Sequence, residues 1–327
     1  MFRYFKDSQM LSQGVLLALN AEGEINEIDR ACRKVTVSNG IPEVTSWFNA
    51  WTELGGLLTD QADADLKLRR RVSAGHKLRR ACVYFGLCER YIPHIDPRKA
   101  QCYARMRATF RHYVELSREP VELVEIPYEK GQSLPGLFIP AAKPGRAPTL
   151  IFIDGFDLYK ELVYLRKNHD AARLRDMAML ILDTPGVGEA LRLRGIPTRH
   201  DTEVPVRACF AWLSDRPDVD LDRVGLIGLS LGGYYAPRAA AFEPRVKACV
   251  AFGAQWDVGA RWRVEHYGAD AASSNLSAPD TQLLWVTGQK TREDALCVLD
   301  AFSLDGNAQK IRAPLLVVHS AADHLVS

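Results

Sequence analysis

The feature that most constrains the fold is a series of short, mostly apolar runs in the second two-thirds of the chain. These runs are Thr149–Ile153, Met179–Leu182, Val224–Gly228, Val246–Phe252 and Pro314–Val318. Such runs are typical of strands that are buried on both faces of a parallel sheet. Helical stretches at about 159–174, 202–214, 232–242 and 291–302 separate most of them. This alternation predicts an α/β fold with a doubly wound, mostly parallel sheet.

The first third of the chain has a different pattern. Up to about residue 118, apolar residues recur at three- and four-residue spacings, as at Leu68 and Val72, which predicts helices. Near residue 120 the β-rich segments Val121–Ile126 and Leu134–Pro140 begin. We therefore predict a helical domain over 1–118 and an α/β core over 119–327. The long gap before Pro314 is expected to hold extra helices over the site, within 257–310.

The segment Gly228-Leu-Ser-Leu-Gly232 carries the most specific chemical signal. This G-x-S-x-G pattern directly follows an apolar run and precedes a helical stretch. A serine on such a sharp strand-to-helix turn is exposed above the sheet, with the N–H groups of the helix N-terminus behind it. We therefore predict that Ser230 is the nucleophile of a serine hydrolase. The alternative is a glycine-rich turn that binds phosphate, but the G-x-G-x-x-G spacing of a dinucleotide site is absent.

Acyl transfer also needs N–H donors for the oxyanion of the tetrahedral intermediate. One is predicted to be the backbone N–H of Leu231, directly after the nucleophile. The other is expected from the loop after the run that ends at Ile153, where Gly155 allows close approach and Phe156 supplies the N–H. The alternative for this loop is an ordinary strand-to-helix turn.

The triad acid is expected after a later strand. Asp323 fits, because it follows the Pro314–Val318 run in the next turn, and Asp257 is the rival. In this class of hydrolase the order along the chain is serine, acid, histidine. His324 adjoins the acid, and the other histidines all precede it: His76, His94, His112, His169, His200, His266 and His319. We therefore expect the catalytic histidine beyond residue 327, so that the C-terminal end of the fold is missing.

Composition excludes several other classes of protein. The chain is 47% hydrophobic and 25% charged with a net charge of +2, which is ordinary for a globular protein and predicts no nucleic-acid partner. The basic segment Lys67–Arg80 is interpreted as a solvated helix face, with a phosphate site as the alternative. No uncharged run reaches membrane-spanning length. Seven cysteines without a C-x-x-C pair predict buried reduced thiols and a cytoplasmic protein, and no metal or cofactor is expected.

The residues around Ser230 also resemble a known family. The stretch from Gly228 to Ala254 resembles the 2,6-dihydroxypseudooxynicotine hydrolases, and it is similar to fungal pigment hydrolases that shorten polyketides and to fermentation–respiration-switch esterases. Leu134–Pro140, Asp154–Glu161 and Asp183–Glu189 match as well, and the match covers about residues 75 to 323. The resemblance implies an α/β-hydrolase fold whose N-terminal helical domain is a cap.

The resemblance further implies an activity. It implies hydrolysis of a carbon–carbon bond next to a ketone in a 1,3-dicarbonyl substrate that is aromatic or polyketide-like, with Asp157 as an assisting carboxylate. An N-cap role for Asp157 is the alternative. A carboxylesterase with the same machinery and an inactive hydrolase-like fragment are the alternative functions. The expected partner is a small-molecule substrate, and no association with a membrane is expected. A homodimer is an open alternative.

Overall fold

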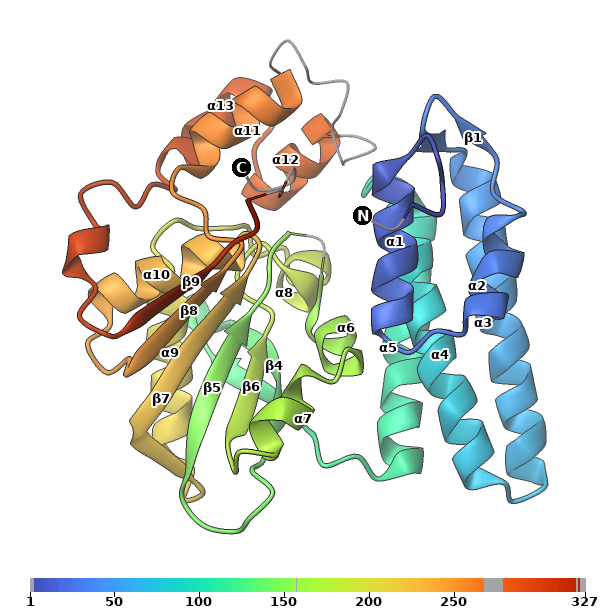
Figure 1. Cartoon of the computed structure of the whole chain (residues 1–327), viewed down its shortest axis with the longest axis horizontal. Helices are drawn as coiled ribbons and strands as arrows, with labels where there is room; N and C mark the ends of the chain where they lie inside the picture. Colours follow the sequence, from blue (N-terminus) through green and yellow to red (C-terminus); the bar gives the residue numbers. More distant parts are fainter. Residues whose placement is uncertain (1–2, 157, 268–278, 322, 324–327) are drawn as a thin grey trace. The chain divides into compact units, whose positions relative to one another are not determined.

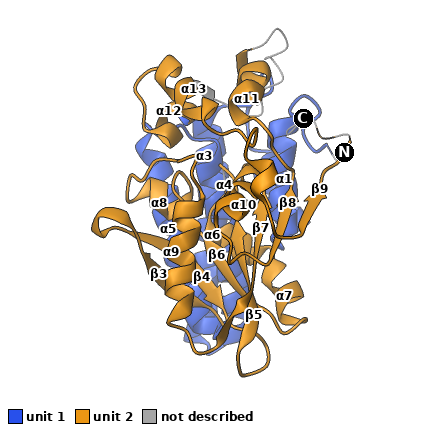
Figure 2. Ribbon diagram, turned by 90° about the vertical axis from the view of Figure 1, so that its left-hand side faces the viewer, with its two compact units in different colours: residues 1–119, 275–282 blue, residues 120–274, 283–327 orange. Residues whose placement is uncertain are grey.

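The chain forms two compact units. A computed structural model describes residues 3–156, 158–267, 279–321 and 323. Residues 1–119 and 275–282 make up unit 1, and residues 120–274 and 283–327 make up unit 2 (Figure 2). The function of residues 1–118 as a cap stays a prediction.

Unit 1 is mainly helical (Figure 1). Its elements are α1 Gln9–Asn20, α2 Ile25–Cys32, β1 Val37–Ser38, β2 Ile41–Pro42, α3 Val44–Lys67, α4 Arg71–Arg90 and α5 Pro97–Ser117. The break before α5 follows from the sequence, because Pro97 suits a first helical turn and Asp96 Oδ1 accepts a hydrogen bond from the N–H of Arg98 at 2.9 Å. Gly55 allows α3 to approach α4, since a Cβ there would lie 2.7 Å from the Phe85 ring.

Unit 1 also contains a small hairpin that the helical pattern did not predict. β1 and β2 pair in antiparallel register, with Val37 opposite Pro42. Asn39 and Gly40 join the strands with φ values of 50° and 76°. Asn-Gly is a preferred pair for such a turn, because both central residues must adopt a left-handed conformation. The Asn39-Gly40 dipeptide is therefore the feature of the sequence that indicates this hairpin.

The structure corrects the prediction for the cysteines. Cys88 of α4 and Cys102 of α5 form a disulfide, with sulfur atoms 2.24 Å apart and Cα atoms 6.0 Å apart. Spacing along the chain could not indicate this pair, because the two residues lie on neighbouring helices. The other five cysteines are free, and Cys297 is exposed. Burial raises the pKa of Cys32 and Cys249 to about 12, so these thiols stay protonated at neutral pH.

Unit 2 is built on a seven-stranded sheet with the order β3-β4-β6-β5-β7-β8-β9. The strands are β3 Glu122–Pro127, β4 Ser133–Ile139, β5 Ala147–Ile153, β6 Ala178–Leu182, β7 Val219–Leu229, β8 Ala248–Phe252 and β9 Leu315–Val318. β3 and β4 pair antiparallel, β4 pairs antiparallel with β6, and the remaining pairs are parallel. The predicted doubly wound, mostly parallel sheet is confirmed.

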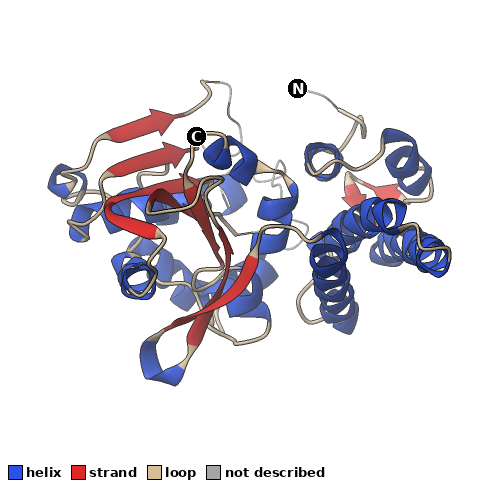
Figure 3. Ribbon diagram, turned by 90° about the horizontal axis from the view of Figure 1, so that it is seen from below, coloured by secondary structure: helices blue, strands red, loops and turns tan. Residues whose placement is uncertain are grey.

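Helices cover both faces of this sheet (Figure 3). α9 and α10 contact β7, whereas α6 and α7 contact β6. The helices are α6 Lys160–Leu165, α7 Asn168–Arg173, α8 Gly188–Arg192, α9 Glu203–Ser214, α10 Gly232–Phe242, α11 Val258–Tyr267, α12 Pro279–Thr287 and α13 Arg292–Asp300, with short 3₁₀ helices η1 Glu129–Gly131 and η3 Ala308–Lys310. α12 runs across the division between the units. In the described part of the chain, no helix combines the length and the apolar character needed to cross a membrane.

Candidate active site

Ser230 lies at the turn between β7 and α10 in a strained backbone conformation. Its φ is 60°, in the left-handed region that costs a non-glycine residue about 1–2 kcal/mol. Two hydrogen bonds hold the turn: the Ser230 N–H donates to the Phe252 carbonyl at 2.9 Å, and the Ser230 carbonyl accepts from the Gly233 N–H at 2.7 Å. Retention of strain at one polar residue is typical of functional sites. The predicted strand–turn–helix context of Ser230 is therefore present.

The glycines around this turn are required by close packing. A Cβ on Gly228 would overlap the carbonyl of Gly232, and a Cβ on Gly232 would overlap the carbonyl of Ile153. A Cβ on Gly233 would meet the carbonyl of Gly253 in the same way. The pattern G-x-S-x-G-G thus reflects backbone segments that pass each other with no room for a side chain.

The loop after β5 lies directly against Ser230. A Cβ on Gly155 would lie 2.8 Å from the Leu231 nitrogen and 3.2 Å from Ser230 Oγ. The Leu231 N–H belongs to the first turn of α10, where N–H groups have no acceptor within their own helix. Phe156 follows Gly155 in this loop and is half-buried. The structure therefore brings together Ser230 and the backbone of both predicted oxyanion residues.

Asp323 follows β9 at the same edge of the sheet. β7, β8 and β9 are parallel neighbours, so their carboxyl ends meet there. The Gly253 N–H donates to the Val318 carbonyl at 2.8 Å, which extends the pairing of β8 with β9 toward Ser230. His319 Nε2 lies 3.8 Å from Asp323 Oδ2. Asp157 and His324 lie outside the described residues.

Asp257, the rival for the triad acid, caps a helix, and two of the histidines differ in their exposure to solvent. Asp257 Oδ1 accepts a hydrogen bond from the Ala260 N–H at 2.8 Å and so caps the start of α11. His200 is exposed on the surface. His266 is buried, and its ring centroid lies 4.2 Å from that of Trp262. His200 is thus on the surface, whereas His266 is in the interior beside α11's Trp262.

α11 contributes two neighbouring residues, Trp262 and Arg261, that lie near the predicted site residues. The ring centroid of Trp262 lies 5.4 Å from that of Phe156. Its neighbour Arg261 is half-buried, and burial lowers the pKa of this guanidinium, while the carboxylates of Glu265 and Asp323 act in the opposite direction. One helix therefore approaches both the loop after β5 and the predicted acid.

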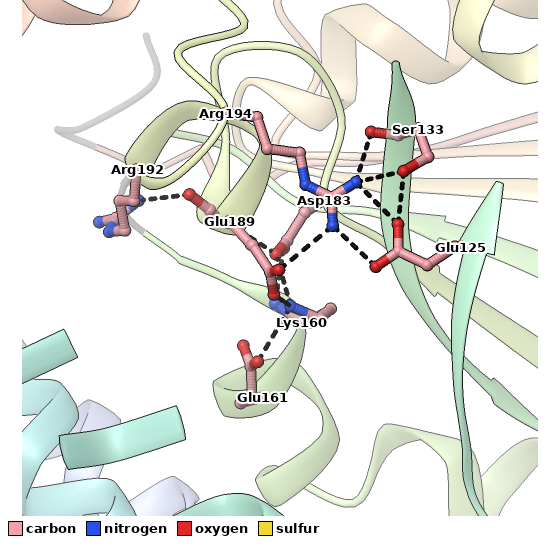
Figure 4. A network of polar contacts seen from close by, with 9 residues as sticks. Glu125, Ser133, Lys160, Glu161, Asp183, Glu189, Arg192 and Arg194 are labelled. Carbon is pink, nitrogen blue, oxygen red and sulfur yellow. Dashed lines mark hydrogen bonds and ion pairs between the residues drawn. The ribbon is translucent and has the colours of Figure 1, made fainter. Parts of the chain in front are cut away.

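A buried ionic network joins α6, α8 and the loop after β6 at the carboxyl edge of the sheet (Figure 4). Lys160 Nζ, which is 3% exposed, lies 3.1 Å from Asp183 Oδ2, 2.8 Å from Glu189 Oε2 and 2.9 Å from Glu161 Oε1. Asp183 also accepts hydrogen bonds from the backbone N–H groups of Lys160 and Glu189, both at 2.8 Å. The start of α6 is thereby connected to the loop after β6 and to the start of α8.

Charges in this network shift each other's protonation. Burial opposes the charge of Lys160, but Asp183, Glu161 and Glu189 outweigh it and raise the pKa of the ammonium group. Burial raises the pKa of Glu161 above its usual range, although Lys160 acts against this. Arg194 continues the network outward, donating to Glu189 Oε1 at 3.2 Å. Sequence reasoning missed these residues because their partners are far apart in the chain.

Comparison with known proteins places the chain among hydrolases. A family model described as "Esterase FrsA-like" matches residues 42–258. The alpha/beta hydrolase xenA of Xenoacremonium sinensis is 35% identical over 225 residues, which are 66% of this chain and 52% of that protein. The 20-hydroxy-prefusarin hydrolase FUS2 of Gibberella moniliformis (strain M3125 / FGSC 7600) is 29% identical over 87% of this chain and 75% of its own length. The chain spans about half the length of several such relatives.

Solved structures show the same fold. The 2,6-dihydroxy-pseudo-oxynicotine hydrolase superposes with a TM-score of 0.76 and 22% identity, over 94% of this chain and 81% of that one. AbyA5 superposes with a TM-score of 0.68 and 20% identity, over 97% and 81%. The resemblance noted in the sequence is thus confirmed. The chain has the α/β-hydrolase fold and belongs to the FrsA-like esterase family.

Proposed function

We propose that this hydrolase uses Ser230 as a nucleophile to cleave a carbon–carbon bond next to a ketone in a 1,3-dicarbonyl substrate. The observation that carries the proposal is the left-handed backbone of Ser230 at the β7–α10 turn, with the Gly155 loop against its hydroxyl. A serine with only a structural role gains nothing from this strain, whereas a nucleophile gains exposure above the sheet.

The proposed reaction proceeds through an acyl-enzyme. Ser230 Oγ adds to the ketone carbon, and the N–H groups of Leu231 and Phe156 stabilise the oxyanion. The bond to the neighbouring carbon then breaks, and its electron pair leaves as an enolate that takes up a proton. Water hydrolyses the acyl-serine ester to a carboxylic acid and free serine. Asp323 is the proposed acid, which orients the histidine that removes the Ser230 proton.

The substrate class rests on the resemblance of the Gly228–Ala254 stretch to the 2,6-dihydroxypseudooxynicotine hydrolases, and two similar proteins carry hydrolase names. One is named 20-hydroxy-prefusarin hydrolase and another 2,6-dihydroxy-pseudo-oxynicotine hydrolase. Ester hydrolysis is the second candidate, because the matching family model is described as an esterase and the same serine chemistry serves both bonds. Asp157 remains the proposed assisting carboxylate for carbon–carbon cleavage.

Labelling and turnover test the proposal separately. In a protein that includes the predicted catalytic histidine beyond residue 327, a fluorophosphonate probe should label Ser230, and Ser230→Ala should abolish labelling. Ser214→Ala is the control, because the Ser214 hydroxyl bonds within α9 to the Ala211 carbonyl at 2.6 Å. Labelling of the Ser230→Ala variant would refute the assignment. Absence of label from that protein without any substitution would favour an inactive hydrolase-like protein.

Product analysis separates the two reactions. Benzoylacetone, a 1,3-diketone, and p-nitrophenyl butyrate, an activated ester, are offered in parallel. Release of benzoate or acetate from the diketone supports carbon–carbon cleavage. Turnover of the ester alone would replace it with the esterase function.

A further inference from the structure

Two buried polar atoms in residues near the Ser230 turn have no hydrogen-bond partner within the described part of the chain. They are Oε1 of Gln255 and Nε1 of Trp262. Gln255 is 3% exposed and Trp262 is 2% exposed. A buried polar group without a partner costs about 1–3 kcal/mol, so such groups are rare in folded proteins unless a ligand or water satisfies them. One atom is an acceptor and the other a donor.

The backbone connects Gln255 closely to the nucleophile. Gly253 lies beside Ser230, since a Cβ on Gly253 would be 3.7 Å from the Ser230 Cα. The next residue, Ala254, packs against the first turn of α10, where a Cβ on Gly233 would be 3.1 Å from the Ala254 Cα. Gln255 is therefore held at the carboxyl end of β8, one strand away from the strand that carries Ser230.

Trp262 reaches the same region from α11. Its ring packs against that of Phe156 with centroids 5.4 Å apart and planes inclined by 49°. Phe156 follows Gly155, the residue that lies against Ser230 Oγ. The loop after β5 thus contacts Ser230 through Gly155 and the indole of Trp262 through Phe156.

We propose that Trp262 and Gln255 are the groups that recognise the enol form of a 1,3-dicarbonyl substrate, an inference that rests on the proposed function. An enolised 1,3-dicarbonyl is planar and carries one carbonyl oxygen and one hydroxyl group. The indole N–H of Trp262 donates to the carbonyl oxygen, and the amide oxygen of Gln255 accepts from the enol hydroxyl. Before cleavage the central carbon gains a proton and the hydroxyl group loses one, which gives the diketone that Ser230 attacks. The aromatic rings of Phe156 and Trp262 provide an apolar surface for the planar ligand.

A matched pair of ligands tests this without turnover. Benzoylacetone enolises, whereas its 2,2-dimethyl derivative has no hydrogen on the central carbon and stays a diketone. Binding of both is measured by calorimetry on the full chain carrying Ser230→Ala, so that no substrate is consumed. We expect benzoylacetone to bind about 3- to 10-fold more tightly, the contribution of one hydrogen bond. Equal affinity for the two ligands would overturn the proposal.

Two conservative variants assign the contacts. Gln255→Met removes the acceptor at similar volume and should abolish the preference for the enolising ligand. Trp262→Phe removes the N–H and should weaken binding of both ligands by about 3- to 10-fold, because both carry carbonyl oxygens. A preference that survives Gln255→Met, or unchanged affinities in Trp262→Phe, would refute the corresponding contact.

Trp51→Phe is the matched control. Trp51 Nε1 is also buried without a partner, but its ring packs in unit 1 against Trp47 and Tyr84. This variant should leave both affinities unchanged. The ligand comparison needs neither substitution, so it stands even if a variant fails to fold. Labelling of wild-type Ser230 is measured independently, which distinguishes failure of this inference from failure of the proposed function.

Discussion

Replacing Lys160 with methionine removes a buried positive charge and keeps an unbranched side chain of similar length. In the wild-type chain the ammonium group contacts the carboxyl groups of Asp183, Glu161 and Glu189 at 2.8–3.1 Å. After the substitution these three acidic groups face one another in a region that excludes water. The backbone hydrogen bond from residue 160 to Asp183 is not affected by the change.

The expected loss of stability is large. Removal of one partner from a buried ion pair typically costs about 3–5 kcal/mol, because the remaining charge is left without compensation. Lys143→Met is the control: Lys143 Nζ lies 2.5 Å from Asp176 Oδ2, but the two side chains are 77% and 40% exposed. An exposed pair contributes about 0–1 kcal/mol. The same lysine-to-methionine change should therefore differ several-fold in effect between the two positions.

Urea unfolding followed by circular dichroism measures both variants, with the slope of the transition checked for constancy. Lowering the pH should reduce the deficit of Lys160→Met, because the uncompensated carboxylates take up protons in the folded state. A loss below about 1 kcal/mol, similar to that of Lys143→Met, would refute the reasoning that Lys160 compensates these charges.

Three further changes are predicted. Because burial raises the pKa of Glu161, the folded state keeps a proton that the unfolded chain has lost, so the free energy of unfolding falls as the pH rises above the usual pKa near 4.5. Glu161→Gln should flatten this fall when unfolding free energies are measured up to about pH 8. An unchanged slope would contradict the prediction. Gly228→Ala should prevent proper folding or cost more than about 3 kcal/mol of stability, because the new Cβ overlaps the Gly232 carbonyl. Its control, Gly56→Ala in α3, meets nothing within 4 Å and should stabilise the chain by about 0.5–1 kcal/mol. Equal midpoints of thermal unfolding for the two variants would refute this contrast. Asp257→Ala should lower the midpoint of thermal unfolding through loss of about 1 kcal/mol of capping, while labelling of Ser230 persists; loss of labelling in a folded variant would make Asp257 the acid instead.

Strands buried on both faces could be predicted from the sequence, and less regular elements could not. β7 begins at Val219, five residues before the predicted run, because its first part includes the exposed Asp222 and Arg223. The predicted helix over 159–174 is divided into α6 and α7 at Lys167, which has a φ of 58°. A lysine gives no local signal for a left-handed conformation, so tertiary packing decides the position of the break.

The same contrast holds for the site. Ser230 and Gly155 could be predicted because a strained turn and close backbone approach require particular residue types at fixed spacing. A role for Trp262 in the site could not be predicted, because an aromatic residue in a helix packs in a core far more often than it contacts a ligand. Lys160 was missed for a related reason, since its carboxylate partners Asp183 and Glu189 become neighbours only after β5 and β6 pair.

The left-handed backbone of Ser230 also limits how the protein can be improved by laboratory evolution. Glycine adopts this conformation without penalty, so Ser230→Gly should raise stability by about 1–2 kcal/mol. A selection for heat resistance alone would therefore favour loss of the proposed nucleophile. Libraries screened for stability should keep this codon fixed or include a readout of turnover at every round.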